Sequence, residues 1–171
     1  MKIDFSKIID ISMPISESMP VYGGRPEKKP QVTIQSDFKT GHVYESRIDM
    51  NLHTGTHMDA PLHMQPGGET IESLKLENLI TPCKVLDLTF VEDKITAADL
   101  DNKNINKDDF LLFKTRNSYE DILEGAFVYL DKTAARFLAD KKIKGVGIDA
   151  LGVERAQPEH ETHNLLLMQV L

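Results

Sequence analysis

Several features that are common in proteins are scarce or missing in this chain of 171 residues, and each absence narrows the range of functions. Cys83 is the only cysteine, which excludes an intrachain disulfide and a zinc site built from several thiolates. No apolar run approaches the ~18 residues that a membrane helix needs. Residues 1–12 lack the cationic start and apolar stretch of a secretory signal. We therefore expect a soluble, cytoplasmic protein that does not enter a membrane.

The chain also has fewer positively charged than negatively charged residues. Twenty Lys and Arg residues stand against 27 Asp and Glu residues, which gives a formal net charge of −7. A nucleic-acid-binding protein needs a basic face to neutralise phosphates, so nucleic acid is excluded as a partner. The glycine pairs at 23–24 and 67–68 lack the spacing of a phosphate-binding loop, and there is no Gly-x-Ser-x-Gly nucleophile motif.

The hydrophobic pattern indicates an α/β protein in which strands dominate the first half. The length predicts one domain over residues 1–171, since domains average roughly 150 residues. Residues 43–52 alternate polar and apolar side chains, which is typical of a half-buried strand. Cys83 is expected to be a buried structural thiol. The other predicted elements are buried strands at 8–12 and 145–149, strands at 85–90 and 110–115, a short helix from Thr96, and a helix over 130–142 with Asp131 as N-cap.

Half of the six histidines lie within residues 53–63. His53, His57, Asp59 and His63 all occupy odd positions and continue the polar phase of the preceding strand. A helix would also place some of them on one face, but glycine at 55 and proline at 61 disfavour a helix here. We therefore expect a strand followed by a loop. If the backbone stays extended, these four side chains leave one face and the even positions point toward the core.

Imidazole and carboxylate groups in this pattern suit a divalent metal ion. Catalytic zinc commonly takes three protein ligands, and His53, His57 and Asp59 could supply them. His63 could instead remain close to the metal ion and move protons. Gly55 lets backbones approach closely and favours a crowded pocket. Two other interpretations stay open: ordinary surface histidines, and a purely structural metal site.

The window His53-Thr-Gly-Thr-His-Met-Asp-Ala-Pro-Leu-His63 resembles the signature of the cyclase family, which contains bacterial kynurenine formamidases and isatin hydrolase. The resemblance covers nearly the whole chain, because the segments 10–22, 114–118 and 146–163 also resemble parts of that family. It implies a swivelling β/β/α fold with a mixed, β-rich sheet flanked by helices. It further implies a homodimer or a homotetramer.

The resemblance also implies a set of metal ligands. His53, His57 and Asp59 would bind one ion, usually Zn²⁺ or Mn²⁺, and Asp59 could bridge to a second. His163 would be a ligand of that second ion. His160 is its rival on spacing alone, but the order Thr-His followed by a leucine run matches the family at His163.

The activity implied by the resemblance is hydrolysis of a small-molecule aryl formamide or cyclic amide, such as N-formylkynurenine to kynurenine and formate. His63 would be the general acid/base, and Tyr22 would line the substrate pocket. The family also carries a glutamate ligand beyond its late histidine, whereas residues 164–171 contain no acidic residue. The chain is therefore expected to be a C-terminally short domain. The alternative function is a degenerate, non-catalytic family member that binds metal or ligand.

Overall fold

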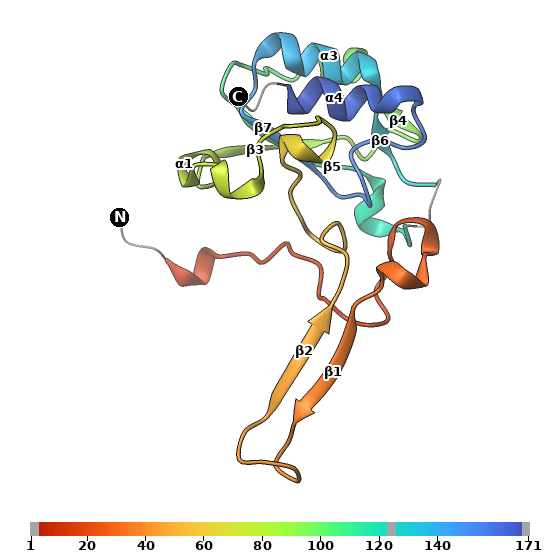
Figure 1. Cartoon of the computed structure of the whole chain (residues 1–171). Coiled ribbons are helices and arrows are strands. Elements are labelled where there is room, and N and C mark those ends of the chain that lie inside the picture. Colours follow the sequence, from red (N-terminus) through yellow and green to blue (C-terminus); the bar gives the residue numbers. More distant parts are fainter. Residues whose placement is uncertain (1–3, 123–125, 169–171) are drawn as a thin grey trace. The chain divides into compact units, whose positions relative to one another are not determined.

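The computed structural model describes residues 4–122 and 126–168, and the chain divides into two compact units, residues 1–58 and 59–171. Helices and strands are both present (Figure 1), so the predicted mixed α/β class is confirmed. The strands are grouped in three small sheets rather than in one. Within the described residues, no helix is long and apolar enough to span a membrane.

The first unit contains a two-stranded hairpin of β1 (Gln31–Ser36) and β2 (Glu45–Asp49). The strands are antiparallel, with Val32 opposite Ile48. The strand predicted over 43–52 is present but shorter. Its predicted half-burial is wrong, because β2 is exposed along its whole length. Alternation here marks one apolar face of a hairpin, on which Val32, Ile34 and Ile48 are each about half exposed.

The remainder of the first unit is mostly irregular. The buried strand predicted at 8–12 is wrong, because these residues form no strand and Ile8, Ile9 and Ile11 are exposed. Met19 and Val21 are buried instead. Three short 3₁₀ turns complete this unit: η1 (Phe5–Lys7), η2 (Tyr22–Gly24) and η3 (Pro26–Lys28).

A parallel sheet organises the second unit. Its strand order is β3 (Cys83–Asp87), β5 (Phe110–Lys114) and β7 (Gly145–Ile148), with β5 in the centre. All three strands were predicted, with β3 displaced toward the N-terminus. That displacement places Cys83 at the start of an edge strand with its side chain exposed, so the buried thiol predicted there is wrong. A second parallel pair joins β4 (Lys94–Ile95) to β6 (Tyr129–Leu130).

The helices of the second unit begin at caps that the sequence encodes. The predicted helix is α3 (Lys132–Lys141), and Oδ1 of Asp131 accepts hydrogen bonds from the backbone N–H groups of Thr133 and Ala134. The predicted short helix is α2 (Ala97–Leu100), with a capping box formed by Thr96 and Asp99. The other elements are η4 (Pro61–His63), η5 (Ile71–Ser73), α1 (Leu76–Leu79), η6 (Arg116–Tyr119), η7 (Pro158–His160) and α4 (Glu161–Leu167).

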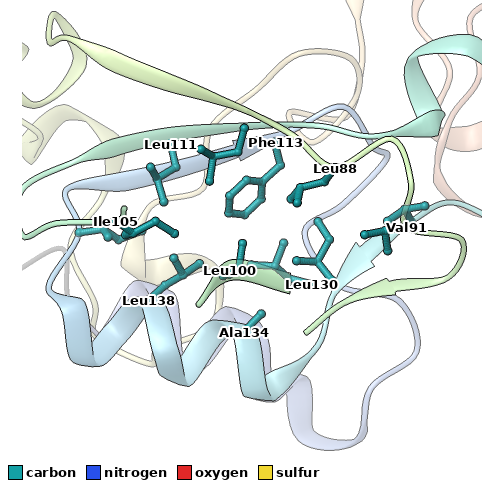
Figure 2. Packing of buried hydrophobic residues seen from close by; sticks show 13 residues of the cluster. Leu88, Val91, Leu100, Ile105, Leu111, Phe113, Leu130, Ala134 and Leu138 are labelled. Carbon is teal, nitrogen blue, oxygen red and sulfur yellow. The ribbon is translucent and has the colours of Figure 1, made fainter. Parts of the chain in front are cut away.

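The hydrophobic core of the second unit lies between the parallel sheet and helix α3 (Figure 2). Leu111 and Phe113 of β5 point toward Ala134 and Leu138 of α3, and Leu130 fills the space beside them. All five side chains are nearly or completely buried. Helix α4 packs against α3, so this core fixes the position of the helix that carries His163.

Candidate metal centre

The backbone over residues 53–63 is not extended. It contains a left-handed turn at Gly55, where φ is 76°, and ends in the 3₁₀ turn η4. The prediction that odd positions share one face therefore rested on the wrong conformation. Among the even positions, Thr54 is buried, but Met58 and Leu62 are about half exposed. Turns, and not strand alternation, therefore shape the backbone of this window.

Two hydrogen bonds and a close approach hold the beginning of this window in the first unit. Oγ1 of Thr54 donates to the carbonyl of Lys28 at 2.9 Å. Oγ1 of Thr56 accepts from the backbone N–H of Met13 at 2.8 Å. A Cβ atom at Gly55 would lie only 2.8 Å from Cδ1 of Ile15, so this position combines positive φ with the crowding expected there.

His53 and His57 lie next to each other in the first unit. Their ring centroids are 5.2 Å apart and the ring planes are nearly perpendicular. Nδ1 of His57 lies 2.8 Å from the carbonyl oxygen of Gly55. A carbonyl only accepts hydrogen bonds, so Nδ1 carries the proton and Nε2 carries the lone pair. Nε2 is therefore the nitrogen through which His57 would bind a metal ion, if it is a ligand as predicted.

The second unit brings Asp59, His63 and His163 together. One possible ligand atom from each lies within 4.8 Å of the other two. Nε2 of His163 is 3.8 Å from Oδ2 of Asp59, and the His63 and His163 rings are 5.5 Å apart. The His163 and Asp59 side chains are only 12% and 24% exposed. Residues far apart in the sequence thus form a compact, partly desolvated set of donors.

His160 and His163, the two candidates for the late histidine ligand, differ in position and surroundings. His163 lies on α4 with Nε2 toward Asp59. His160 precedes α4 in a left-handed conformation, its side chain is 62% exposed, and its Nδ1 lies 2.7 Å from Oε1 of Glu154. His163 is therefore the one of the two that lies beside Asp59, and the choice of His163 as the metal ligand stays a prediction.

Glu154 is the residue of this region that the sequence reasoning missed. Its side chain is almost fully buried, and Oε1 lies 2.9 Å from Nδ1 of His163. Burial alone would raise the pKa of the Glu154 carboxyl. The close approach of His163, followed by the hydrogen bond from His160, outweighs burial and leaves the pKa of Glu154 below its ordinary value. A glutamate followed at six and nine residues by histidines was the signal available in the sequence.

Tyr22, the predicted substrate-binding residue, begins η2 in the first unit and is partly buried. Nζ of Lys28 lies 5.4 Å from its ring centroid, within the range of a cation–π contact. Its contact with substrate stays a prediction.

The donor set suits a divalent metal ion. Imidazole nitrogens and carboxylate oxygens are ligands of zinc and, with more oxygen, of manganese. The sharing of an ion by all four predicted ligands stays a prediction.

Imidazole and carboxylate donors grouped in this way are typical of metal-dependent enzymes, hydrolases among them. The chain belongs to the family described as "Putative cyclase", whose model matches residues 9–155. It is 28% identical over 167 residues to the kynurenine formamidase of Bacillus cereus, covering 94% of this chain and 77% of that protein. It is 29% identical over 154 residues to the kynurenine formamidase of Bacillus anthracis, covering 87% of this chain and 71% of that protein.

Solved structures agree with this placement. One, described as a potential metal-dependent hydrolase with cyclase activity, is 51% identical with a TM-score of 0.86, and the match covers 95% of this chain and 77% of that one. A second, described as a predicted metal-dependent hydrolase from Bacillus stearothermophilus, is 53% identical with a TM-score of 0.84, over 94% and 77% of the two chains. Isatin hydrolase A from Labrenzia aggregata, at 22% identity and a TM-score of 0.77 over 94% and 76%, shares the fold. The comparisons support a hydrolase of the cyclase family.

Proposed function

We propose that this chain is a metal-dependent hydrolase of a small aryl formamide or cyclic amide, with N-formylkynurenine as the first substrate to test. The observation that carries the proposal is the convergence of Asp59, His63 and His163 donor atoms within 4.8 Å. The names of the relatives supply the substrate class, since kynurenine formamidases are among them.

The proposed ligands are His53, His57, Asp59 and His163, holding one or two ions of zinc or manganese. When bound, such an ion supplies Lewis acidity toward the amide carbonyl and lowers the pKa of a water molecule at the site. Asp59 contributes negative charge that favours a cation at this point. The Nδ1 atom of His57 faces the Gly55 carbonyl, so Nε2 is the nitrogen proposed to bind the ion.

His63 is the proposed general acid/base. It lies at the end of η4, exposed to solvent, with its ring 5.5 Å from that of His163. An imidazole in this position would take a proton from the attacking water and deliver it to the leaving amine nitrogen. Imidazole is suited to both steps because its ordinary pKa of about 6.5 lies near neutral pH.

The test is hydrolysis of N-formylkynurenine by metal-stripped protein, with and without added Zn²⁺ or Mn²⁺. We expect turnover only with metal, and a loss of roughly 10²–10⁴-fold in kcat for His63→Ala, the usual contribution of general acid–base catalysis. The matched control is His42→Ala, which removes an exposed histidine of the first unit and should leave kcat unchanged. Metal-independent turnover, or full activity of His63→Ala, contradicts the mechanism. Metal binding without turnover of amides favours the alternative of a non-catalytic binding protein.

A further inference from the structure

One oxygen of the Glu154 carboxylate accepts hydrogen bonds at the start of helix α4. Oε2 accepts hydrogen bonds from the backbone N–H groups of Thr162 at 3.0 Å and His163 at 3.3 Å, and from Nε2 of Gln157 at 3.3 Å. The first N–H groups of a helix have no partners within it. At α4 the N-cap residue is His160, whose side chain makes no capping bond. Glu154 thus caps α4 from outside the helix, with its negative charge at the favourable end.

The other oxygen faces the imidazoles. Oε1 lies 2.7 Å from Nδ1 of His160 and 2.9 Å from Nδ1 of His163. An ionised carboxylate only accepts hydrogen bonds, so both Nδ1 atoms must carry protons for these contacts to be favourable. At His163 the 2.9 Å contact is close in distance, but Nδ1 makes no hydrogen bond with any described residue. The histidine χ2 torsion is soft, and ring rotation aligns the proton.

The proton on Nδ1 determines the state of Nε2, on the opposite side of the His163 ring. With the proton on Nδ1, Nε2 has the lone pair, and this atom lies 3.8 Å from Oδ2 of Asp59. His57 shows the same arrangement, with a carbonyl in place of the carboxylate. An acceptor behind the ring is how proteins fix the tautomer and raise the basicity of a metal-binding histidine.

We propose that Glu154 is a positioning residue for His163. Its two oxygens couple the placement of helix α4 to the orientation and tautomer of the imidazole, so that Nε2 is presented to a metal ion beside Asp59. The inference rests on the proposed function in one respect, which is that His163 serves as a ligand.

A competing arrangement is a metal ion bound by Glu154, His160 and His163 themselves, whose donor atoms also lie within 4.8 Å of one another. The 2.7 and 2.9 Å separations favour hydrogen bonds instead. Two ligands each ~2.0 Å from one tetrahedral ion would be about 3.3 Å apart. Which nitrogen of His163 responds to metal distinguishes the two arrangements.

The first experiment uses the unsubstituted full chain, labelled with ¹⁵N-histidine and freed of metal. Long-range ¹H–¹⁵N correlation spectra at an alkaline pH, where imidazole is neutral, report which ring nitrogen is protonated, and His163→Gln assigns the signals. We expect Nδ1 to be protonated in His163 and Nε2 to shift when Zn²⁺ is added. A protonated Nε2 in the metal-free chain, or Zn²⁺ bound at Nδ1, overturns the proposal.

The second experiment substitutes the carboxylate. In Glu154→Gln the single carbonyl oxygen is needed by the Thr162 N–H, so the amide NH₂ faces the imidazoles and favours the opposite tautomer of His163. We expect Zn²⁺ affinity to fall about 10- to 100-fold, the usual effect of losing such a partner, and Glu154→Asp to retain part of it. Glu159→Gln makes the same change of charge on an exposed side chain of the same loop and is the matched control.

The outcomes separate this inference from the proposed function. Unaltered tautomer and affinity in Glu154→Gln contradict the positioning role even if the chain is an active hydrolase. If the unsubstituted chain binds no metal, the proposed function fails while the tautomer measurement still decides what Glu154 does. If Glu154→Gln loses its helix signal in circular dichroism, the protonated nitrogen of His163 in the unsubstituted chain supports or overturns the proposal by itself.

Discussion

Replacing Thr162 with valine tests the network that anchors α4, and its cost can be worked out from the contacts. Thr162 is completely buried. Its hydroxyl donates to the carbonyl of Leu130 at 3.0 Å and accepts from Nε2 of Gln157 at 2.7 Å. Valine has nearly the same shape, so Thr162→Val removes these two hydrogen bonds and opens no cavity.

Neither partner is left unsatisfied by this substitution. Nε2 of Gln157 still donates to the Leu130 carbonyl at 3.0 Å and lies 3.3 Å from Oε2 of Glu154. Each lost hydrogen bond costs about 1 kcal/mol net, and burying the added methyl group returns up to ~0.8 kcal/mol. We therefore expect Thr162→Val to lower the free energy of unfolding by about 1 kcal/mol. Thr162→Ala lacks the added methyl group and also deletes a buried one, so it should cost roughly 2 kcal/mol more than Thr162→Val.

The assay is urea unfolding followed by circular dichroism on the metal-free chain. The midpoint should move while the denaturant slope stays constant, which marks a change in stability alone. Thr33→Val makes the same change at an exposed position of β1 and should alter the free energy by less than ~0.5 kcal/mol. A Thr162→Val chain as stable as the original, or one that loses ~3 kcal/mol or more, would refute the reasoning, because the hydroxyl would then carry no hydrogen bonds or irreplaceable ones.

Two further predictions concern pH and self-association. Hydrogen bonds from Lys84 and from the backbone N–H of Asn106 hold the pKa of Asp109 below its ordinary value. The resulting stability is present above the unfolded pKa of about 3.9 and is lost as pH falls through the lower folded value. Asp109→Asn should therefore be about 0.2–1 kcal/mol less stable than the original chain at neutral pH. Urea unfolding measured at decreasing pH should show this difference in stability disappear. We also propose that the chain forms a homodimer or homotetramer, because a two-stranded hairpin with an exposed apolar face is only marginally stable without further packing. Light scattering should give a smaller mass for Ile34→Glu than for Thr33→Glu, which lies on the opposite face of the hairpin. A monomeric original chain would contradict the proposal.

The sequence predicted best where local signals suffice. Asp131 was identified as an N-cap because side chains of this type satisfy free N–H groups in any helix, and Asp131 performs that role at α3. The strands β5 and β7 were found because they are short apolar runs between turn residues, and both are present. Such signals depend on neighbours in the chain and not on the tertiary structure.

The errors arose where burial depends on distant partners. The apolar residues at 8–12 have the composition of a buried strand, but no strand forms there. Cys83 is exposed because it begins an edge strand, which only the sheet order reveals.

The candidate site likewise has one part that the sequence predicted and another that it did not. The grouping of His53, His57, Asp59 and His63 in one window could be read from spacing, whereas the extended backbone assumed for it was wrong. The role of Glu154 could not be derived, since its contacts with His160 and His163 depend on a loop with three non-glycine residues at positive φ, namely Ala156, Glu159 and His160.

The parallel order of β3, β5 and β7 also governs the kinetics of assembly. Parallel strands pair only across long connections, and such non-local pairing is slow because the entropy of loop closure is lost before contacts form. Asp59 precedes this sheet in the chain and His163 follows it. We therefore expect their donor atoms to meet late in folding, once β7 has paired with β5. A metal ion held by Asp59 and His163 together would need the folded second unit, so binding through this pair would stabilise the native state.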